Sequence, residues 1–196
     1  MDIERFCVKF FARPGATIDD SIFINIFNEW IRYERLGGIL LDVADYRHVP
    51  QGAGIMLITH EINFSMDYSL GCFGLLAQRK LGKGISHQER ILELVQAAAD
   101  FGAQLESDLR VSGKLRLAAG NFFYMANDRL IAPNTEAAFA ELHSDLESVA
   151  GVIYQGRPVT IKRVENDPRA RLTASVQAGS LDMKTLAESV SAVRSR

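Results

Sequence analysis

The spacing of apolar residues divides this chain into amphipathic helices and short strands. Apolar positions at i, i+4 and i+8 predict a helix over 22–31, and comparable stripes predict helices over 86–105 and 136–149. Apolar runs bounded by Gly, Pro, Asn or Ser are typical of strands. Strands are expected at residues 5–11, 38–44, 54–64, 70–78, 114–125 and 159–164.

The order of these elements, β-α-β-β-β-α-β-α-β, predicts an α+β (mixed α/β) fold in a single domain over residues 1–168. We expect a mixed sheet of about six strands with the helices mainly on one face. Short links within residues 5–44 favour a right-handed parallel crossover. Residues 169–196 are small and polar, which predicts a tail that is mobile or docked on a partner, with room for a short helix from Asp182.

Composition and charge are those of an ordinary globular protein. Hydrophobic residues make up 47% of the chain and charged residues 23%, which predicts an ordered core. The net charge of −2 argues against nucleic-acid binding, because a dedicated binder needs an excess of Lys and Arg to neutralise phosphates. Arg79, Lys80 and Lys83 are accompanied by Gly rather than by aromatic residues, and we interpret them as a solvated loop.

The chain has no segment that predicts secretion or membrane insertion. Its longest uncharged apolar run, 54–59, is far shorter than the ~20 residues that cross a bilayer. We therefore expect a cytoplasmic protein that does not associate with membranes. Cys7 and Cys72 lie in apolar runs outside any Cys-x-x-Cys pair, so we expect core thiols and predict neither a metal site nor a cofactor.

Polar residues that could carry chemistry follow the second predicted strand. Asp42 lies within an apolar run, where it is either a buried carboxylate that holds the next loop through backbone N–H groups or a carboxylate presented at the end of a parallel strand, where open sheets bind ligands. Asp45, Tyr46 and His48 form the entry to the loop. Either Tyr46 packs while Asp45 and His48 cap the turn, or these groups belong to a site.

His60 is a further candidate. Alternation along the predicted strand 54–64 places His60 and Glu61 on opposite faces, so they cannot share a metal or act as an acid–base pair. His60 then falls on the apolar face, either as a core or interface histidine or as a ligand contact.

Asp128 and Arg129 form a second polar cluster. They would join Asp45 and His48 in one site only if the turn 127–129 folds beside the loop, and a metal site needs three or four convergent ligands. The sequence contains no Gly-x-Ser-x-Gly elbow and no phosphate loop. Covalent catalysis and nucleotide binding by that route therefore have no support.

The segment 121–125, Asn-Phe-Phe-Tyr-Met, places large apolar side chains on both faces of a strand. If helices cover only one face, the other must meet a second layer or a second subunit. A symmetric homodimer is the commonest solution.

The segments LDVADYRHVPQGAG (41–54), LITHE (57–61) and DRLIAPNT (128–135) are similar to an uncharacterised family of small bacterial cytosolic proteins. The similarity covers most of residues 5–160 and leaves out the tail. It implies a bacterial soluble protein and no particular activity.

We therefore predict a non-catalytic small-ligand or protein-binding module that acts as a homodimer. Binding would use the loop 42–48 and the turn 127–129. One alternative is a hydrolase or metal-assisted enzyme, in which Asp42, Asp45, His48 and Asp128 serve as acid–base groups or ligands and Arg129 clamps an anion. Another is a subunit of a larger assembly, with the tail ordering on its partner.

Overall fold

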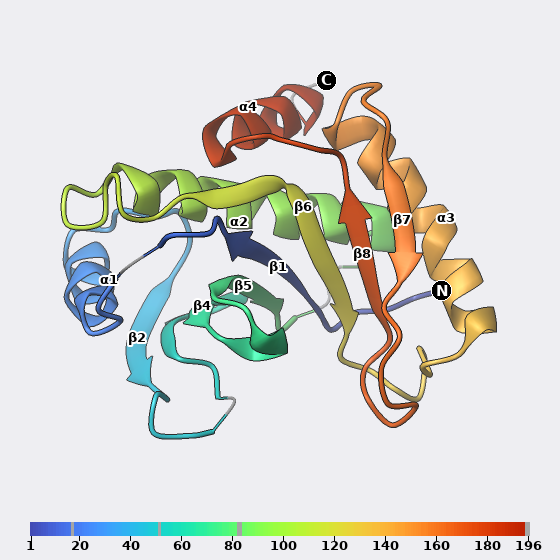
Figure 1. The fold of residues 1–196 in the computed structure, drawn as a ribbon, viewed down its shortest axis with the longest axis horizontal. Helices are drawn as coiled ribbons and strands as arrows, with labels where there is room; N and C mark the ends of the chain where they lie inside the picture. The colour runs from blue at the N-terminus through green and yellow to red at the C-terminus, as the bar shows by residue number, and fades with distance from the viewer. Residues whose placement is uncertain (17, 51, 82–83, 195–196) are drawn as a thin grey trace.

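The strands of the described residues form one sheet of eight, in which every hydrogen-bonded pair of neighbours is antiparallel (Figure 1). The computed structural model describes residues 1–16, 18–50, 52–81 and 84–194. The spatial order is β2-β3-β4-β5-β1-β6-β8-β7. The strands are β1 (Phe6–Ala12), β2 (Leu40–Asp45), β3 (Ile55–Thr59), β4 (Ile62–Asp67), β5 (Gly74–Arg79), β6 (Leu117–Ala126), β7 (Thr160–Arg163) and β8 (Thr173–Gln177). The helices are α1 (Ile22–Arg32), α2 (His87–Ser107), α3 (Glu136–Ile153) and α4 (Met183–Arg194), with a 3-10 turn, η1 (Ser69–Gly71).

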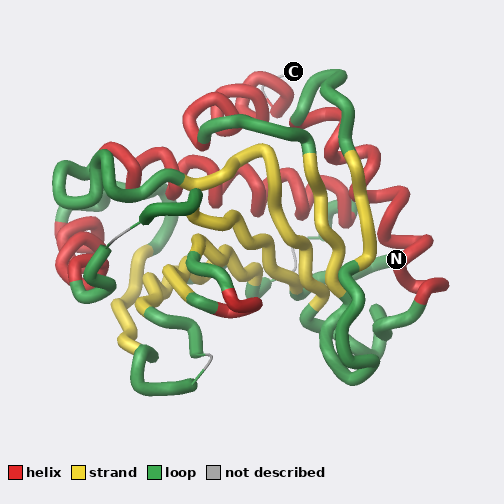
Figure 2. Tube along the Cα trace, in the orientation of Figure 1, coloured by secondary structure: helices red, strands yellow, loops and turns green. Residues whose placement is uncertain are grey.

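The α-helices lie on one side of the sheet, which we call the helix face, and leave an open face on the other side (Figure 2). Alternation along β1 sorts its side chains between these faces. Phe6 and Phe10 are buried on the helix face, where Phe6 contacts the ring of His87 on α2. Cys7 and Lys9 point to the open face. The predicted α+β class and the expected one-sided placement of the helices agree with this arrangement.

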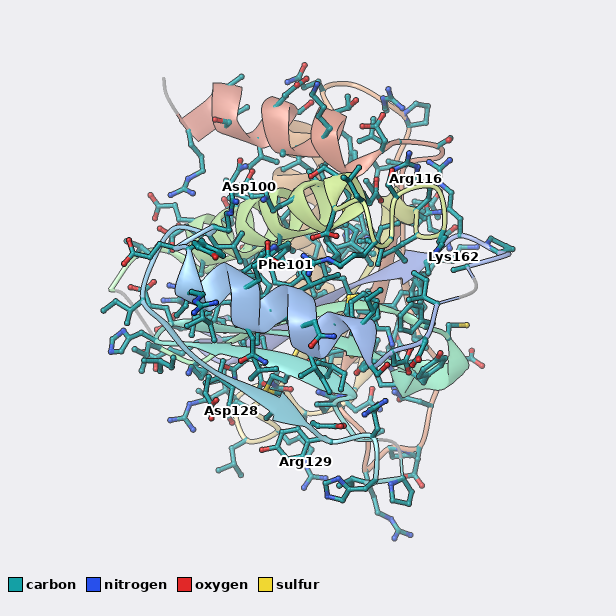
Figure 3. All side chains as sticks on the ribbon, turned by 90° about the vertical axis from the view of Figure 1, so that its left-hand side faces the viewer. Asp100, Phe101, Arg116, Asp128, Arg129 and Lys162 are labelled. Carbon is teal, nitrogen blue, oxygen red and sulfur yellow. The ribbon has the colours of Figure 1, made fainter. Side chains whose placement is uncertain are left out.

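Aromatic side chains join α1 and α2 over the sheet. Phe101 of α2 lies beside α1 (Figure 3), with its ring 5.1 Å from that of Trp30 and 5.5 Å from that of Phe27. Phe64 of β4 stacks on Phe101 from the sheet. The predicted start of α2 is confirmed, since Ser86 caps it in a capping box. None of the helices in the described residues has the length and apolar character needed to cross a membrane.

The predicted parallel crossover is wrong. Three strands, β3, β4 and β5, separate β1 from β2, and the sheet is antiparallel rather than mixed. The chain continues from β2 through short antiparallel connections to β5, and β5 then pairs with β1. Because this chain of hairpins leads back to β1, it leaves β2 at the edge of the sheet.

The predicted strand 54–64 is two strands. The chain turns at His60 and Glu61, so β3 and β4 form a hairpin. The Thr59 hydroxyl accepts from the Ile62 backbone N–H and donates to the Ile62 carbonyl at 2.5 Å, which stabilises the turn without Gly or Asn. This hairpin and β8 raise the number of strands from about six to eight.

Residues 173–194 belong to the fold rather than to a mobile or partner-docked tail, and the short helix expected from Asp182 is confirmed as α4. β8 pairs with β6 and β7, and α4 packs against α2. The connection between them passes so close to β6 that a Cβ at Gly120 would lie 1.8 Å from the Gly179 carbonyl oxygen. The absence of a side chain at Gly120 thus permits this close packing. From composition alone, the same segment resembles a polar tail.

Candidate functional site

The acidic residues of β2 make local contacts. Asp42 is exposed, and its carboxylate accepts from the backbone N–H of Val43 at 2.8 Å. Asp45 forms an exposed ion pair with Arg47 at 2.6 Å, and the hydrogen bonds from Arg47 lower the pKa of Asp45 to about 2. Because β2 is an antiparallel edge strand, placing Asp42 at the end of a parallel strand was wrong.

The loop after β2 is open to solvent. Tyr46 and His48 are exposed. Tyr46 and Arg47 line a hollow of about 290 Å³ together with Asp20 and Tyr68, whose hydroxyl lies 3.5 Å from the Asp20 carboxylate. The hollow collects one cation, one acid and two phenols, so its charges are compensated within it.

His60 and the turn 127–129 lie elsewhere. His60 is exposed at the β3–β4 turn, which corrects its expected place on an apolar strand face. Asp128 accepts from the backbone N–H groups of Leu130 and Ile131, and Arg129 donates to the Arg169 carbonyl. Asp128 therefore braces its own turn, and Arg129 ties that turn to the loop that contains Arg169.

The structure does not gather the predicted site residues into one place. Four strands lie between β2 and β6, and the loops that follow these strands occur at opposite sides of the lower part of Figure 1. Within the described ranges, no three His, Cys, Asp or Glu side chains are placed to hold a metal ion. The metal-assisted enzyme alternative therefore has no set of metal ligands among the described residues.

A different set of polar side chains converges on the open face, at the end of the sheet where β1 begins. Cys7 pairs in register with Gln78 of β5 and Met125 of β6, and Met125 pairs with Thr173 of β8. Extended two residues beyond these pairs, just past the strand ends, this register places four residues on the same face, because side chains two apart share a face. In spatial order they are Lys80, Arg5, Asn127 and Arg171, which we call the cationic row.

Backbone hydrogen bonds continue past the strand ends, linking Arg5 to Asn127 and fixing Lys80 to the β4 side. The Asn127 N–H donates to the Arg5 carbonyl at 2.9 Å, and the Lys80 N–H donates to the Glu61 carbonyl at 3.0 Å. On the β8 side, Ala126 donates to Leu172 at 3.0 Å. The positions of these side chains are thus fixed by the sheet rather than by a free loop.

The cationic row borders a pocket of about 530 Å³. Cys7, Leu76 and Gln78 form part of its lining. Asn127 links the row to the thiol: its Nδ2 donates to Cys7 Sγ at 3.1 Å, and its Oδ1 accepts from Arg171 Nη1 at 2.9 Å.

The positive charges of this pocket are uncompensated by nearby acids. In the part of the chain that the structure describes, Arg5, Lys80 and Arg171 form no ion pair with a carboxylate. Lys80 donates to the Thr59 carbonyl, which leaves its charge unneutralised. Arg79 also lines the pocket, but its guanidinium pairs with Glu93 of α2 at 3.1 Å.

The thiol in the pocket is unsuited to nucleophilic attack. Burial raises the pKa of Cys7 and outweighs the opposing effect of Arg171, so the sulfur stays protonated near neutral pH. Cys7 is buried, as expected, whereas Cys72 is exposed, which corrects its prediction as a core thiol. The described lining of the pocket contains no imidazole or carboxylate that could act as a general base.

A buried network on the helix face has a structural role. His87 Nδ1 lies 2.7 Å from the Asp145 carboxylate of α3, and its Nε2 lies 2.9 Å from the Tyr124 hydroxyl of β6. Burial lowers the pKa of His87 despite the opposing effect of Asp145, so the ring is neutral near pH 7. Its Nδ1–H then donates to Asp145 while Nε2 accepts from Tyr124, and the network ties α2 and α3 to β6.

This network predicts pH-dependent stability. Because the pKa of His87 is lower in the folded chain than the ~6.5 of an unfolded one, the unfolded state binds more protons between these values. The free energy of unfolding should therefore fall as the pH drops below about 6.5, with a slope of at most about 1.4 kcal/mol per pH unit from this residue. The nearby Arg90 and the N-terminal ammonium act in the same direction.

Urea denaturation at pH values from 5.0 to 7.5 measures this slope. His87→Gln should flatten it, whereas His48→Gln, which changes an exposed histidine, should leave it unchanged. An equal slope in the His87→Gln variant and the parent protein would show that His87 is not the titrating group.

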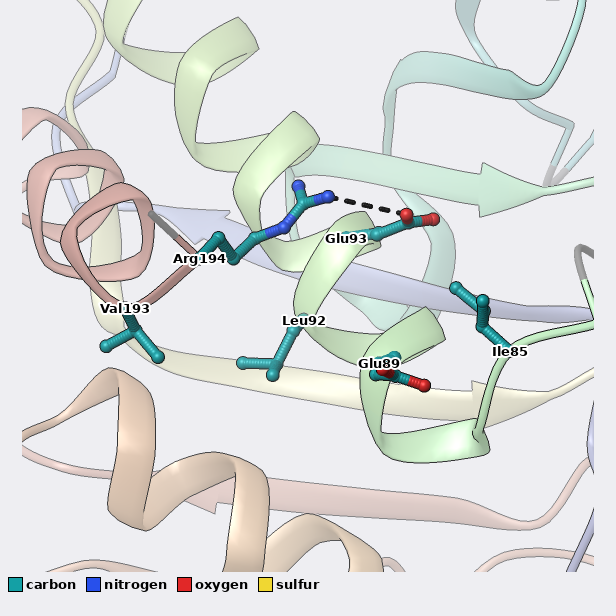
Figure 4. Close-up of a pocket in the computed structure, with 6 residues that line it drawn as sticks. All are labelled: Ile85, Glu89, Leu92, Glu93, Val193 and Arg194. Carbon is teal, nitrogen blue, oxygen red and sulfur yellow. Dashed lines mark hydrogen bonds and ion pairs between the residues drawn. The ribbon is translucent and has the colours of Figure 1, made fainter. Parts of the chain in front are cut away.

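A further pocket of about 310 Å³ lies between α2 and α4 (Figure 4). Glu93 there pairs with Arg194 at 3.4 Å as well as with Arg79. Leu92 and Val193 supply apolar surface on either side. Because Arg194 is paired with Glu93 and the lining also includes Glu89, which bonds to Ser86, this pocket offers an anion less than the open-face pocket does.

Nothing in the local sequence singles out Arg5 or Arg171, and Lys80 was expected in a solvated loop. Lys83, expected in the same loop, lies outside the described residues. The available signal is the alternation Arg5-Cys7-Lys9 along a predicted strand, which puts polar groups on one face. Asn127 does belong to the predicted turn 127–129.

Comparison with protein-family models, with curated proteins and with solved structures gave no match for this chain. The similarity of residues 41–54 to small bacterial proteins therefore stays a prediction. The candidate site is defined by its own geometry: three cationic side chains and an oriented asparagine around a pocket on the open face of an antiparallel sheet.

Proposed function

We propose that the protein is a non-catalytic binding module that holds a small anionic ligand in the open-face pocket. The observation that carries this proposal is the cationic row, in which Arg5, Lys80 and Arg171 border one pocket without a carboxylate partner in the described residues. Guanidinium groups bind carboxylates and phosphates through paired charge-assisted hydrogen bonds. The pocket volume lies within the range of small-molecule sites.

The contacts of Asn127 support a preorganised site. Its hydrogen bond to Arg171 orients the guanidinium before a ligand arrives, which lowers the entropy lost on binding. Binding rather than catalysis is favoured because the thiol of Cys7 is protonated and the pocket lining has no general base among its described residues.

The homodimer is a separate part of the proposal. Phe122 and Tyr124 of β6 enter the core, while Phe123 lies on the open face beside Phe11, with ring centroids 4.9 Å apart. A half-buried aromatic pair on the open face favours a partner layer there. The cytoplasmic location, the bacterial origin and membership of a larger assembly stay predictions.

Isothermal titration calorimetry tests the anion site. We expect inorganic phosphate or citrate to bind the parent protein at low ionic strength, and the double variant Arg5→Gln/Arg171→Gln to bind at least about 10-fold more weakly, since each charged hydrogen bond contributes about 1.5–3 kcal/mol. Circular dichroism and thermal melting would confirm that the variant is folded.

The double variant Arg129→Gln/Arg169→Gln is a matched control. It removes the same charge from exposed arginines outside the pocket, one of which is the anion clamp of the enzyme alternative. It should bind like the parent protein. The proposal fails if no anion binds, or if both double variants lose affinity equally and the loss therefore reflects only net charge.

A further inference from the structure

We infer that Asn166 is a positioning residue that holds Arg171 at the open-face pocket, and this inference rests on the proposed anion-binding function. Both residues lie in the connection 164–172 between β7 and β8, and only Arg171 belongs to the described pocket lining. The sheet holds Leu172, since the Ala126 N–H donates to its carbonyl at 3.0 Å, but Arg171 is one residue further into the connection. An arginine there needs support to point in one direction, because an unsupported connection samples many conformations.

The Asn166 side chain closes the connection on Arg171. Its Nδ2 donates to the Arg171 carbonyl at 3.2 Å. The Thr173 hydroxyl donates to the same carbonyl at 3.1 Å, so both lone pairs of that oxygen are used. Between the two ends, the Asp167 carboxylate accepts from the Arg169 N–H at 2.7 Å, which keeps the turn compact. The backbone that carries the Arg171 side chain is therefore fixed on both sides.

Asn134 anchors this turn to the rest of the fold. It precedes α3 and is 7% exposed, and its Nδ2 donates to Asn166 Oδ1 at 2.6 Å and to the Asp167 carbonyl at 3.1 Å. Its own Oδ1 accepts from Arg163, the last residue of β7, at 3.2 Å. The connections β6–α3 and β7–β8 accordingly lie side by side (Figure 1). The two amides form one chain of hydrogen bonds from Asn134 through Asn166 to the Arg171 backbone.

The other end of Arg171 is held inside the pocket. Asn127 Oδ1 accepts from its Nη1 at 2.9 Å, and the same nitrogen lies 4.0 Å from Cys7 Sγ. With Asn166 on its backbone and Asn127 on its guanidinium, the side chain is ordered before an anion arrives. Ordering one long side chain on binding would otherwise reduce the affinity by about threefold to tenfold.

Arg129 also reaches this connection, but from solvent. Its guanidinium donates to the Arg169 carbonyl in an exposed contact. Water can replace an exposed hydrogen bond at little cost, whereas the contact of Asn166 with Asn134 is partly buried. The inference therefore concerns Asn166, and removal of Arg129 should leave the anion affinity unchanged.

Asn166→Ala tests the inference at an exposed position, so the variant should fold. Calorimetry at low ionic strength should show that inorganic phosphate and citrate bind this variant about threefold to tenfold more weakly than the parent protein, although the net charge is the same. Asn28→Ala is the matched control. Asn28 is an exposed asparagine of α1 whose amide also donates to a backbone carbonyl, that of Ile24, at 2.9 Å, and its loss should not change the affinity.

A double-mutant cycle shows whether Asn166 acts through Arg171. Arg171→Gln keeps Arg5 and Lys80 and should still bind the anions, but more weakly. In that background, Asn166→Ala should change the affinity by less than about twofold, because the guanidinium that it positions is absent. An equal loss in both backgrounds, or no loss in Asn166→Ala alone, would overturn the inference while the anion site stands.

Nuclear magnetic resonance gives a readout that needs no ligand. The heteronuclear NOE of the Arg171 Nε–H group, assigned by its absence from Arg171→Gln, reports the mobility of this side chain in the free protein. We expect a rigid value in the parent protein and in Asn28→Ala, and a lower value in Asn166→Ala. Equal values in all three would also overturn the inference. If no anion binds the parent protein, the proposed function fails, and the NOE alone decides whether Asn166 orders Arg171.

Discussion

Replacement of Asp67 by alanine is expected to lower the free energy of unfolding by about 3–5 kcal/mol, because it leaves a buried ammonium without its carboxylate. Lys9 lies in the middle of β1 on the open face and has no exposed side-chain surface. Its Nζ donates to the Asp67 carboxylate at 2.6 Å and to the carbonyl of Ser69 at 2.6 Å. Urea denaturation, followed by the fluorescence of the single tryptophan, measures the change.

The direction of the Lys9 pKa supports this expectation. Burial lowers the pKa of Lys9 even though Asp67 acts to raise it, so the charged form depends on its partner. The double variant Lys9→Met/Asp67→Leu removes both charges and should recover much of the lost stability, since replacing a buried pair with apolar groups is often neutral.

An exposed pair provides the contrast. Asp45→Ala breaks the ion pair with Arg47, whose two side chains are each 38% exposed, and should change the free energy of unfolding far less than Asp67→Ala does. Equal losses from Asp67→Ala and Asp45→Ala would contradict the assignment of Lys9 and Asp67 as a buried pair.

Replacement of Trp30 by alanine should also destabilise the protein by about 3–5 kcal/mol, because it empties a site in the core. Trp30 is 2% exposed and contacts the rings of Phe27 and Phe101 at the junction of α1 and α2. Circular dichroism during urea denaturation measures this change, since the variant lacks the only tryptophan.

Tyr33→Ala is the matched control at the end of the same helix. Tyr33 is 57% exposed, so its loss should cost no more than about 0.5 kcal/mol. A loss below 1 kcal/mol for Trp30→Ala would show that α1 does not depend on this aromatic contact.

Local periodicity was sufficient for most elements of the fold. The apolar stripe over 22–31 is the buried face of α1, and Ser86 with Glu89 marks the start of α2. Local periodicity could not predict which strands pair with one another. The parallel crossover was wrong because β5 rather than β2 pairs with β1, and that choice depends on contacts between residues distant in the chain.

Two strands were missed for different physical reasons. The turn at His60 and Glu61 is stabilised by the Thr59 side chain rather than by Gly, Asn or Pro, so the apolar run appeared continuous. β8 is formed by short residues such as Thr173 and Ser175, which have little apolar signal and are buried by the strands on either side.

The predicted binding residues and the candidate site overlap only at the turn 127–129. Asp42, Asp45, Tyr46 and His48 attracted attention because polar groups at strand ends often carry function, yet each acid there bonds within its own loop. The cationic row takes one residue from beside the end of each of four strands. A site assembled in this way has no sequence motif, because its members are up to 166 residues apart, from Arg5 to Arg171.

The sequence by itself determined the α+β class, three of the helices and which side chains of β1 share a face, because these follow from short-range sterics and from burial of apolar stripes. Only the tertiary structure decided the antiparallel order of the sheet, the place of residues 173–194 in it, and the cationic row on the open face. These features depend on which distant strands exchange backbone hydrogen bonds, and backbone groups are the same in every residue except proline.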